Sequence, residues 1–172
     1  MESRKYVEID FNKCIGCKMC IVSCALSHKN QIGSIEQNLN SRLFLNFTAE
    51  KRSASVCQHC TEPECLSTCL NNAMSIVDGL VTINSDKCTG CGLCVDSCNF
   101  NGIHLIKRKK RFDSDSEFVA NKCDLCISNK SGLACVNSCV VRAIKIIEVE
   151  SAVDNNSRQS DVNDEFIDSP FF

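Results

Sequence analysis

The chain has 172 residues and a formal net charge of −2 at pH 7, and 16 of its residues are cysteine. Its hydrophobic fraction of 44% and charged fraction of 23% are ordinary for a globular protein, which excludes a disordered chain and a cysteine-rich peptide without a core. A chain of this length folds as one compact domain or as two very small ones.

The N-terminal residues contain no apolar run of the length that a signal peptide needs, and no later segment is long and apolar enough to cross a bilayer. We therefore expect a cytoplasmic protein without a membrane span. Because a reducing cytoplasm keeps thiols free, metal ligation accounts for the sixteen cysteines better than disulfides do.

The cysteines fall into four groups of four, and none is left over. The first and third groups share the spacing C-x2-C-x2-C-x3-C, whereas the second and fourth lengthen the middle gap to four and eight residues and keep the final x3. This recurrence is an internal repeat. In chain order the groups are Cys14, Cys17, Cys20 and Cys24; Cys57, Cys60, Cys65 and Cys69; Cys88, Cys91, Cys94 and Cys98; and Cys123, Cys126, Cys135 and Cys139.

Short elements are expected to recur with the cysteines, so that each repeat consists of a loop, a short helix and a strand. A strand-like run follows the second, third and fourth groups, each starting at a small residue four positions after the last cysteine. These runs cover residues 73–77, 102–106 and 143–147. The first group lacks such a strand and is followed by an insertion, residues 25–56, with one strand candidate at Leu43–Phe47.

A hairpin is predicted between the second and third groups. Asp78 and Gly79 separate two short apolar runs there, and a two-residue Asp-Gly connection favours a tight turn. We therefore expect these two groups to form one inner unit, residues 57–106. The first and fourth groups are then left to pair as an outer unit, residues 5–24 plus 120–148, that wraps the inner one.

The chain changes in composition after a core that we place at residues 1–150. Residues 151–172 carry five acidic residues, one arginine and no cysteine, which is typical of a solvated tail. The tail ends in Phe171 and Phe172. Such an aromatic end could order on a partner or on a second copy of the chain, or it could be a frayed terminus.

The cysteine spacing indicates iron–sulfur clusters. Three thiolates in a C-x2-C-x2-C loop can bind one cluster, while the fourth, three residues on, points towards a neighbouring cluster, as in bacterial ferredoxins. Zinc is the main alternative, but tetrahedral zinc sites normally take two ligands from each of two short loops. Four such groups predict four [4Fe-4S] clusters.

Basic residues near the cysteines leave two interpretations open. Lys13, Lys87 and Lys122 each precede the first cysteine of a group, and they could raise the reduction potential of a cluster or simply be solvated. The basic run at residues 107–111 could dock an acidic partner or lie on a solvated loop, and we do not expect nucleic-acid binding.

The three histidines are not expected to be metal ligands, because each group of four cysteines is already complete. His59 lies between two cysteines and is predicted to hydrogen bond or pack. His28 and His104 carry no recognisable signal.

Over residues 5–148 the sequence resembles the four-cluster iron–sulfur subunits of molybdopterin (DMSO-reductase-type) oxidoreductases, formate-linked hydrogenase complexes, hydrogen-dependent CO2 reductase and carbon monoxide dehydrogenase systems. The most diagnostic pieces are residues 57–65, with Pro63 two positions before the third cysteine, and residues 122–126, followed by Ala134 and Cys135. One departure is that the proline which family members usually have after each fourth cysteine is absent. The residues at these positions are Ala25, Leu70, Asn99 and Val140.

The resemblance implies an α+β fold of two nested bacterial-ferredoxin-like units, with short strands, short helices and many loops. It also implies how the sixteen cysteines share four [4Fe-4S] clusters. The implied ligand sets are Cys14, Cys17, Cys20 and Cys139; Cys123, Cys126, Cys135 and Cys24; Cys57, Cys60, Cys65 and Cys98; and Cys88, Cys91, Cys94 and Cys69.

No residues resemble a nucleophile, an acid–base pair or a nucleotide-binding loop, so we do not expect catalysis by the chain itself. The resemblance suggests an electron-transfer subunit whose partners are catalytic oxidoreductase subunits, with formate dehydrogenase and hydrogenase first, as in formate hydrogenlyase or hydrogen-dependent CO2 reductase. Alternatives are a carbon monoxide dehydrogenase-associated protein, a freely diffusing polyferredoxin, and a metalloprotein whose metal only holds the fold or senses.

Overall fold

The structure is a computed structural model that describes residues 4–28, 40–107 and 117–149. Most of the basic run, residues 29–39 of the insertion and the whole acidic tail lie outside these residues. Within the described ranges, no helix is long and apolar enough to cross a membrane.

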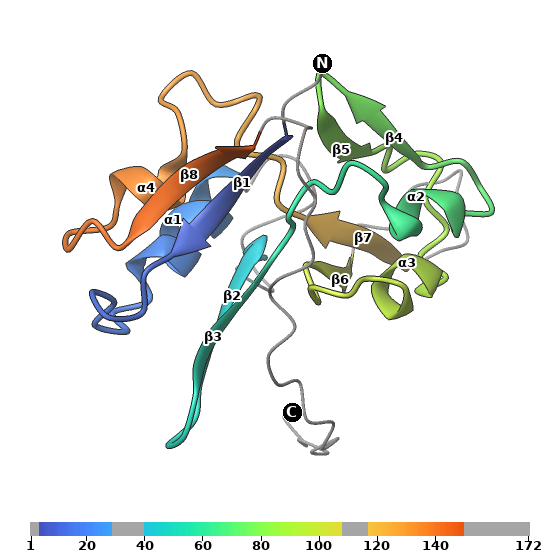
Figure 1. Cartoon of the computed structure of the whole chain (residues 1–172). Helices are drawn as coiled ribbons and strands as arrows, with labels where there is room; N and C mark the ends of the chain where they lie inside the picture. The colour runs from blue at the N-terminus through green and yellow to red at the C-terminus, as the bar shows by residue number, and fades with distance from the viewer. Residues whose placement is uncertain (1–3, 29–39, 108–116, 150–172) are drawn as a thin grey trace.

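Short helices alternate along the described chain with short strands, most of which come in consecutive pairs (Figure 1). Every strand pairs with one other, so each sheet has two strands: β1 with β8, β2 with β3, β4 with β5, and β6 with β7. The elements are β1 (Arg4–Ile9), α1 (Met19–Ser27), β2 (Leu43–Phe47), β3 (Arg52–Val56), α2 (Glu64–Ser67), β4 (Met74–Val77), β5 (Leu80–Ile83), α3 (Leu93–Asp96), β6 (Ile103–Lys107), β7 (Phe118–Lys122), α4 (Ala134–Asn137) and β8 (Ile144–Val149).

The predicted hairpin is present as the pair β4–β5. Asp78 and Gly79 form its turn with φ of 50° and 74°. Two consecutive residues with positive φ match the twist of the flanking strands, which is why Asp-Gly is favoured in this position. The strand runs predicted after the second, third and fourth cysteine groups are also found, as β4, β6 and β8.

The two ends of the described chain meet in the antiparallel pair β1–β8 (Figure 1). Val7 and Ile144 are buried in the core, while Glu8 and Lys145, on the opposite face, form an ion pair of 3.1 Å. Alternation of buried and exposed side chains is what a sheet with one covered face requires. The pair brings the loop of the first cysteine group close to the fourth.

Three strands were not anticipated from the sequence: β1, β3 and β7. The single strand expected in the insertion, β2, is one arm of a hairpin with β3, which projects from the body of the protein (Figure 1). Strand β7 pairs with β6, so that Lys122 lies opposite Ile103.

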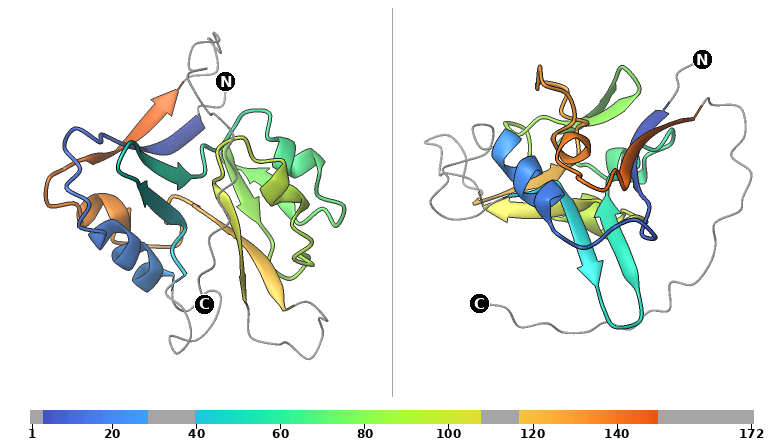
Figure 2. Two further views of the ribbon diagram at one scale, coloured as in Figure 1. Left: turned by 90° about the horizontal axis from the view of Figure 1, so that it is seen from below. Right: turned by 90° about the vertical axis from the view of Figure 1, so that its left-hand side faces the viewer.

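Two hydrophobic cores fill the two halves of the protein, which Figure 2 shows side by side. One core gathers residues of β1, α1, β2, α4 and β8, and the other gathers residues of α2, α3 and β4 to β7. Cysteines lie in both: Cys20, Cys57, Cys123 and Cys135 in the first, and Cys65 and Cys94 in the second. The cores are therefore built around thiols, which agrees with the absence of tryptophan from the chain.

Candidate metal centres

One group of thiols lines a pocket beside α1. Cys14, Cys17 and Cys20 come from the loop and first turn before and within α1, and Cys139 joins them from the end of α4. Apolar side chains from β1, β2 and β8 complete the walls: Ile9, Leu45 and Ile144. Burial, followed by the neighbouring thiols of Cys14 and Cys17, raises the pKa of Cys20 to about 11.

A second pocket repeats this arrangement in the other half of the protein. Cys88, Cys91 and Cys94 surround it from the loop before α3 and from α3 itself, and Cys69 joins them from the end of α2. Burial raises the pKa of Cys94 to about 11, and the thiols of Cys88, Cys91 and Cys69 add to the effect. The two pockets are related by the internal repeat.

Among the other eight thiols, the charge interactions fall within two groups of four. Burial raises the pKa of Cys65 to about 12, with further contributions from Cys57, Cys98 and Cys60. Burial likewise raises the pKa of Cys135 to about 12, and the neighbouring thiols of Cys24, Cys126 and Cys20 add to the effect. Cys123 completes this set through its interaction with Cys24 and Cys135.

Backbone N–H groups point at the fourth cysteine of each group. The small residue four positions later donates to the sulfur: Ala73 to Cys69 at 3.3 Å, Gly102 to Cys98 at 3.3 Å, and Ala143 to Cys139 at 3.2 Å. For Cys24 the donor is the N–H of Arg42, at 3.3 Å, which comes from the insertion. The insertion thus supplies in the first group what the following strand supplies in the others.

These surroundings fit a metal–thiolate cluster. Thiols whose pKa is raised to 11 or 12 by burial and by one another do not ionise at neutral pH unless a cation compensates the charge. Backbone N–H donors that face the sulfurs stabilise thiolate rather than thiol. Four thiols in each set are the number that a [4Fe-4S] cluster takes, and the same number also suits zinc.

Exposure differs sharply among the cysteines. Cys17 and Cys91 are the only exposed ones, while the other fourteen are buried or half-buried. The two occupy the same place in the repeat, as the second cysteine of the first and third groups, and each lines one of the two pockets. The sets that contain them are therefore the most accessible from solvent.

His28 belongs to a buried polar network that the sequence interpretation missed. Its Nδ1 lies 2.7 Å from the carbonyl oxygen of Cys24, and its Nε2 lies 3.0 Å from Oδ1 of Asp124, whose other oxygen pairs with Arg42. Burial alone would lower the pKa of His28, but hydrogen bonds to Asp124, Cys126 and Cys24 raise it to about 11. His28 is thus an imidazolium that donates from both nitrogens.

The repeat itself carried a signal for this network. His28 is four residues after Cys24, where the other groups have alanine or glycine. In the first group a large polar side chain replaces the small one, and the N–H that donates to the sulfur of Cys24 comes from Arg42 instead. The pKa of Asp124 is lowered well below its usual value, because its hydrogen bond to His28 and the charge of Arg42 outweigh burial.

His59 is fully buried, with 0% of its surface exposed, and it hydrogen bonds as predicted. The N–H of Val81 donates to its Nδ1 at 3.1 Å, which leaves the proton on Nε2. Burial, assisted by the charge of Lys122, lowers the pKa of His59 to about 3, so the ring is neutral. Its Nε2 has no hydrogen-bond partner within the described part of the chain. His104, by contrast, packs against Phe44, with ring centroids 3.9 Å apart and ring planes tilted by 52°.

Comparison with known proteins identifies the family. The 4Fe-4S dicluster domain matches residues 50–149, and a second family, the 4Fe-4S binding domain, matches residues 11–27. The chain belongs to the 4Fe-4S dicluster domain family. Its fold is accordingly a ferredoxin-like α+β fold with 4Fe-4S clusters as the bound group.

Similar proteins of this ferredoxin type are found in Escherichia coli. Electron transport protein HydN of strain K12 is 29% identical over 84% of this chain and 88% of HydN, and formate hydrogenlyase subunit 2 is 28% identical over 98% of this chain and 95% of that subunit. AegA of the same strain is 29% identical over 83% of this chain, which spans only 22% of AegA. Among solved structures, a chain of the BamBC complex of benzoyl coenzyme A reductase is similar, with 26% sequence identity and a TM-score of 0.44. The match covers 86% of this chain and 81% of that chain.

Proposed function

We propose that the chain is an electron-transfer subunit of a cytoplasmic oxidoreductase complex, which relays single electrons through four [4Fe-4S] clusters between catalytic subunits. The observation that carries the proposal is that two pockets are each lined by four cysteines and that buried thiols elsewhere act on one another, which supports four sets of four. Four clusters in one small chain would form a series through which single electrons can pass.

The four ligand sets that we propose are those implied by the resemblance, and the pockets and thiol neighbours described above support them. The sets form two nested units, an inner one of residues 57–106 and an outer one of residues 5–24 plus 120–148, followed by a tail that we propose for docking or self-association. They are Cys14, Cys17, Cys20 and Cys139; Cys24, Cys123, Cys126 and Cys135; Cys57, Cys60, Cys65 and Cys98; and Cys69, Cys88, Cys91 and Cys94.

The order of these sets suggests a path through the molecule. Cys20 and Cys135 interact, which makes the first two sets neighbours, and the exposed Cys17 and Cys91 belong to sets in different halves. Electrons would then enter at one exposed set and leave at the other. The chain would provide the cysteine ligands, the backbone N–H groups and the protein that shields the clusters from solvent. The catalysed reactions would take place in the partner subunits.

The partners that we propose are a formate dehydrogenase and a hydrogenase. The support is the similarity to HydN and to formate hydrogenlyase subunit 2 over nearly the whole of both proteins.

The test begins with anaerobic purification of the full chain from its own cells through a mild affinity tag. We expect about sixteen iron and sixteen sulfide per chain, cluster signals in EPR after reduction, and co-purification of formate dehydrogenase and hydrogenase subunits. About four zinc per chain without sulfide would reject the clusters. A cluster-loaded chain that purifies alone would favour a freely diffusing polyferredoxin, and co-purified carbon monoxide dehydrogenase would replace the proposed partners.

A further inference from the structure

Lys122 is a buried lysine at the boundary between the two halves of the protein. Its exposed fraction is 4%, and its ammonium group donates to the carbonyl oxygen of Cys123 at 2.7 Å. Cys123 belongs to the set that also contains Cys24 and Cys135. One side of Lys122 therefore faces a cysteine set of the outer half.

The opposite side of Lys122 faces a set of the inner half. In the β6–β7 pair Lys122 lies opposite Ile103, the residue after Gly102. The N–H of Gly102 donates to the sulfur of Cys98, and a Cβ added to Gly102 would lie 2.6 Å from the nitrogen of Cys57. Strand β7 thus ends between the set of Cys57 and Cys98 and the set of Cys123.

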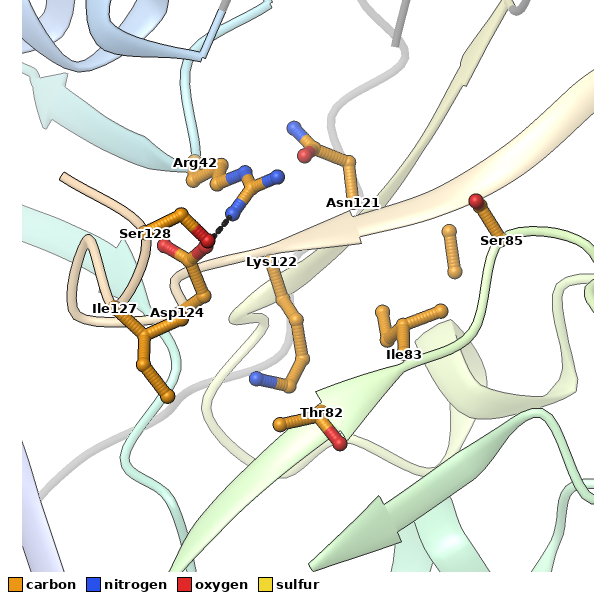
Figure 3. A pocket seen from close by; sticks show the side chains of 10 residues that line it. Arg42, Thr82, Ile83, Ser85, Asn121, Lys122, Asp124, Ile127 and Ser128 are labelled. Carbon is orange, nitrogen blue, oxygen red and sulfur yellow. Dashed lines mark ion pairs between the residues drawn. The ribbon is translucent and has the colours of Figure 1, made fainter. Parts of the chain in front are cut away.

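Figure 3 shows the side chain of Lys122 in a pocket between these halves. Asp124 and Ile127 lie on one side, and Thr82 and Ile83 of β5 lie on the other. The carboxylate of Asp124 is engaged by Arg42 and His28, and no ion pair of Lys122 is found within residues 4–28, 40–107 and 117–149.

The other two lysines at this place in the repeat are different. Lys13 is exposed and lies 3.5 Å from the carboxylate of Asp10, and Lys87 is also exposed. Water screens such charges, whereas a charge in the low-dielectric interior keeps most of its effect over several ångströms. Of the two interpretations that the sequence left open, solvation applies to Lys13 and Lys87.

We propose that the Lys122 ammonium is a fixed positive charge that lies between two clusters, the one held by the set of Cys123 and the one held by the set of Cys57 and Cys98. This charge raises the reduction potentials of both clusters. Reduction adds one negative charge to a cluster, so a nearby buried cation stabilises the reduced form. Both clusters at this boundary are then easier to reduce than they would be without the charge. This inference rests on the proposed clusters and adds a residue that tunes them.

The test uses the full chain, purified anaerobically as Lys122→Met, with Lys122→Arg as the conservative variant and Lys13→Met and Lys87→Met as controls at the equivalent positions. Iron and sulfide are counted first, and the clusters are then titrated against applied potential by EPR. In Lys122→Met we expect two of the four clusters to show a ratio of reduced to oxidised form that is about tenfold lower at a fixed potential, which is 59 mV for a one-electron couple. Lys122→Arg and both controls should stay near the unmodified protein.

Several results would overturn the inference. They are unchanged potentials in Lys122→Met, an equal shift in Lys122→Arg, or a shift of all four clusters together. Loss of iron from Lys122→Met would be checked with Lys122→Gln, and loss from both, with retention in Lys122→Arg, would assign Lys122 to cluster assembly instead of potential. Failure of the proposed function is distinguishable, because it would appear as missing iron and sulfide in the unmodified chain.

Discussion

Single backbone positions decide how closely the chain can approach the sulfurs. At Gly102 the N–H donates to Cys98, while a side chain there would run into the backbone of Cys57. Both cysteines belong to the same proposed set. The φ of Gly102 is not in the left-handed region, so the backbone conformation alone does not call for glycine. Glycine is required because the backbone of Cys57 comes too close to leave room for a side chain.

We expect Gly102→Ala to lose one cluster selectively. The added Cβ would lie 2.6 Å from the nitrogen of Cys57, and backbone atoms cannot move aside as a flexible side chain does. Iron should fall by about four per chain, with the remaining EPR signals retained. Gly132→Ala is the matched control: its φ of 77° costs roughly 1 kcal/mol in strain, but its nearest neighbour is 3.8 Å away, so its iron content should stay unchanged. Full iron in Gly102→Ala would contradict the argument.

Two ion pairs of the protein differ in how deeply their charged side chains are buried. Arg42 and Asp124 have 9% and 19% of their side chains exposed, whereas Lys5 and Glu148 have 47% and 52% exposed. Removing Arg42 would leave the Asp124 carboxylate with one cation, His28, in a largely dry site. An exposed carboxylate such as Glu148 is solvated in either case.

Arg42→Met should therefore lower the free energy of unfolding by about 3 kcal/mol, as expected when one partner of a buried pair is removed. Lys5→Met should lower it by less than about 1 kcal/mol. Urea unfolding of the anaerobic protein, followed by far-UV circular dichroism, measures both. Similar midpoints for the two variants would show that water reaches Asp124 and that the network around His28 is not structurally important.

The β2–β3 hairpin is the element that distinguishes the first cysteine group from its repeats. Its N-terminal approach provides the N–H of Arg42 to Cys24, and Leu45 and Phe47 lie over the loop of the first group. The ring of Phe47 is 3.5 Å from the place where Gly16 would carry a Cβ, and it meets Phe11 edge to face with centroids 6.4 Å apart. The hairpin thus covers a set that contains the exposed Cys17.

Phe47→Ala should make the cluster held by the set of Cys17 more sensitive to oxygen, because the ring that covers its loop is gone. The expected result is a several-fold faster loss of one cluster in air, seen as the decay of one EPR signal, with the anaerobic iron content unchanged. Phe44→Ala is the control on the same strand: it removes the contact with His104 and should not change the decay of that cluster. Equal decay in both variants would mean that Phe47 gives no shielding.

Sequence reasoning predicted elements best where local chemistry determines them. The Asp78-Gly79 turn and the strands after Ala73, Gly102 and Ala143 follow from turn geometry and apolar runs. Strand β7 was missed because Asn121 and Lys122 are polar and yet buried. Asn121 donates to the carbonyl oxygen of Ser41 at 2.9 Å, a contact between segments eighty positions apart that no local pattern reveals.

The cysteine spacing predicted the kind of site, and long-range contacts produced its details. The network of His28, Asp124 and Arg42 joins three segments, and each residue alone is unremarkable in the sequence. The same holds for Lys122, whose position in the repeat equals that of Lys13 and Lys87 and whose burial depends on how the two halves meet. Repeats predict local geometry, and the packing between repeats determines which copies are buried.

At the scale of the whole molecule, the ends of the proposed path are marked by apolar residues in solvent. Leu70 and Val140 are 79% and 76% exposed, and they follow directly on Cys69 and Cys139, which line the two pockets that contain Cys91 and Cys17. Proline is usual at both positions in the proteins that the sequence resembles. Two large exposed apolar side chains, each beside an accessible cysteine set, suit contact with a partner protein.

We expect Leu70→Asp and Val140→Asp to slow electron exchange at opposite ends of the chain. A carboxylate at either position would oppose desolvation of the contact, so one variant should react more slowly, by about tenfold, with the hydrogenase and the other with the formate dehydrogenase. Stopped-flow mixing of the reduced or oxidised chain with each purified enzyme measures the rates, and potentiometric titration should show unchanged cluster potentials. Val77→Asp, on the exposed side of the β4–β5 hairpin, is the control and should alter neither reaction. If both variants slow the same enzyme, the two exposed sets do not serve different partners, and a relay with an end in each half of the molecule is wrong.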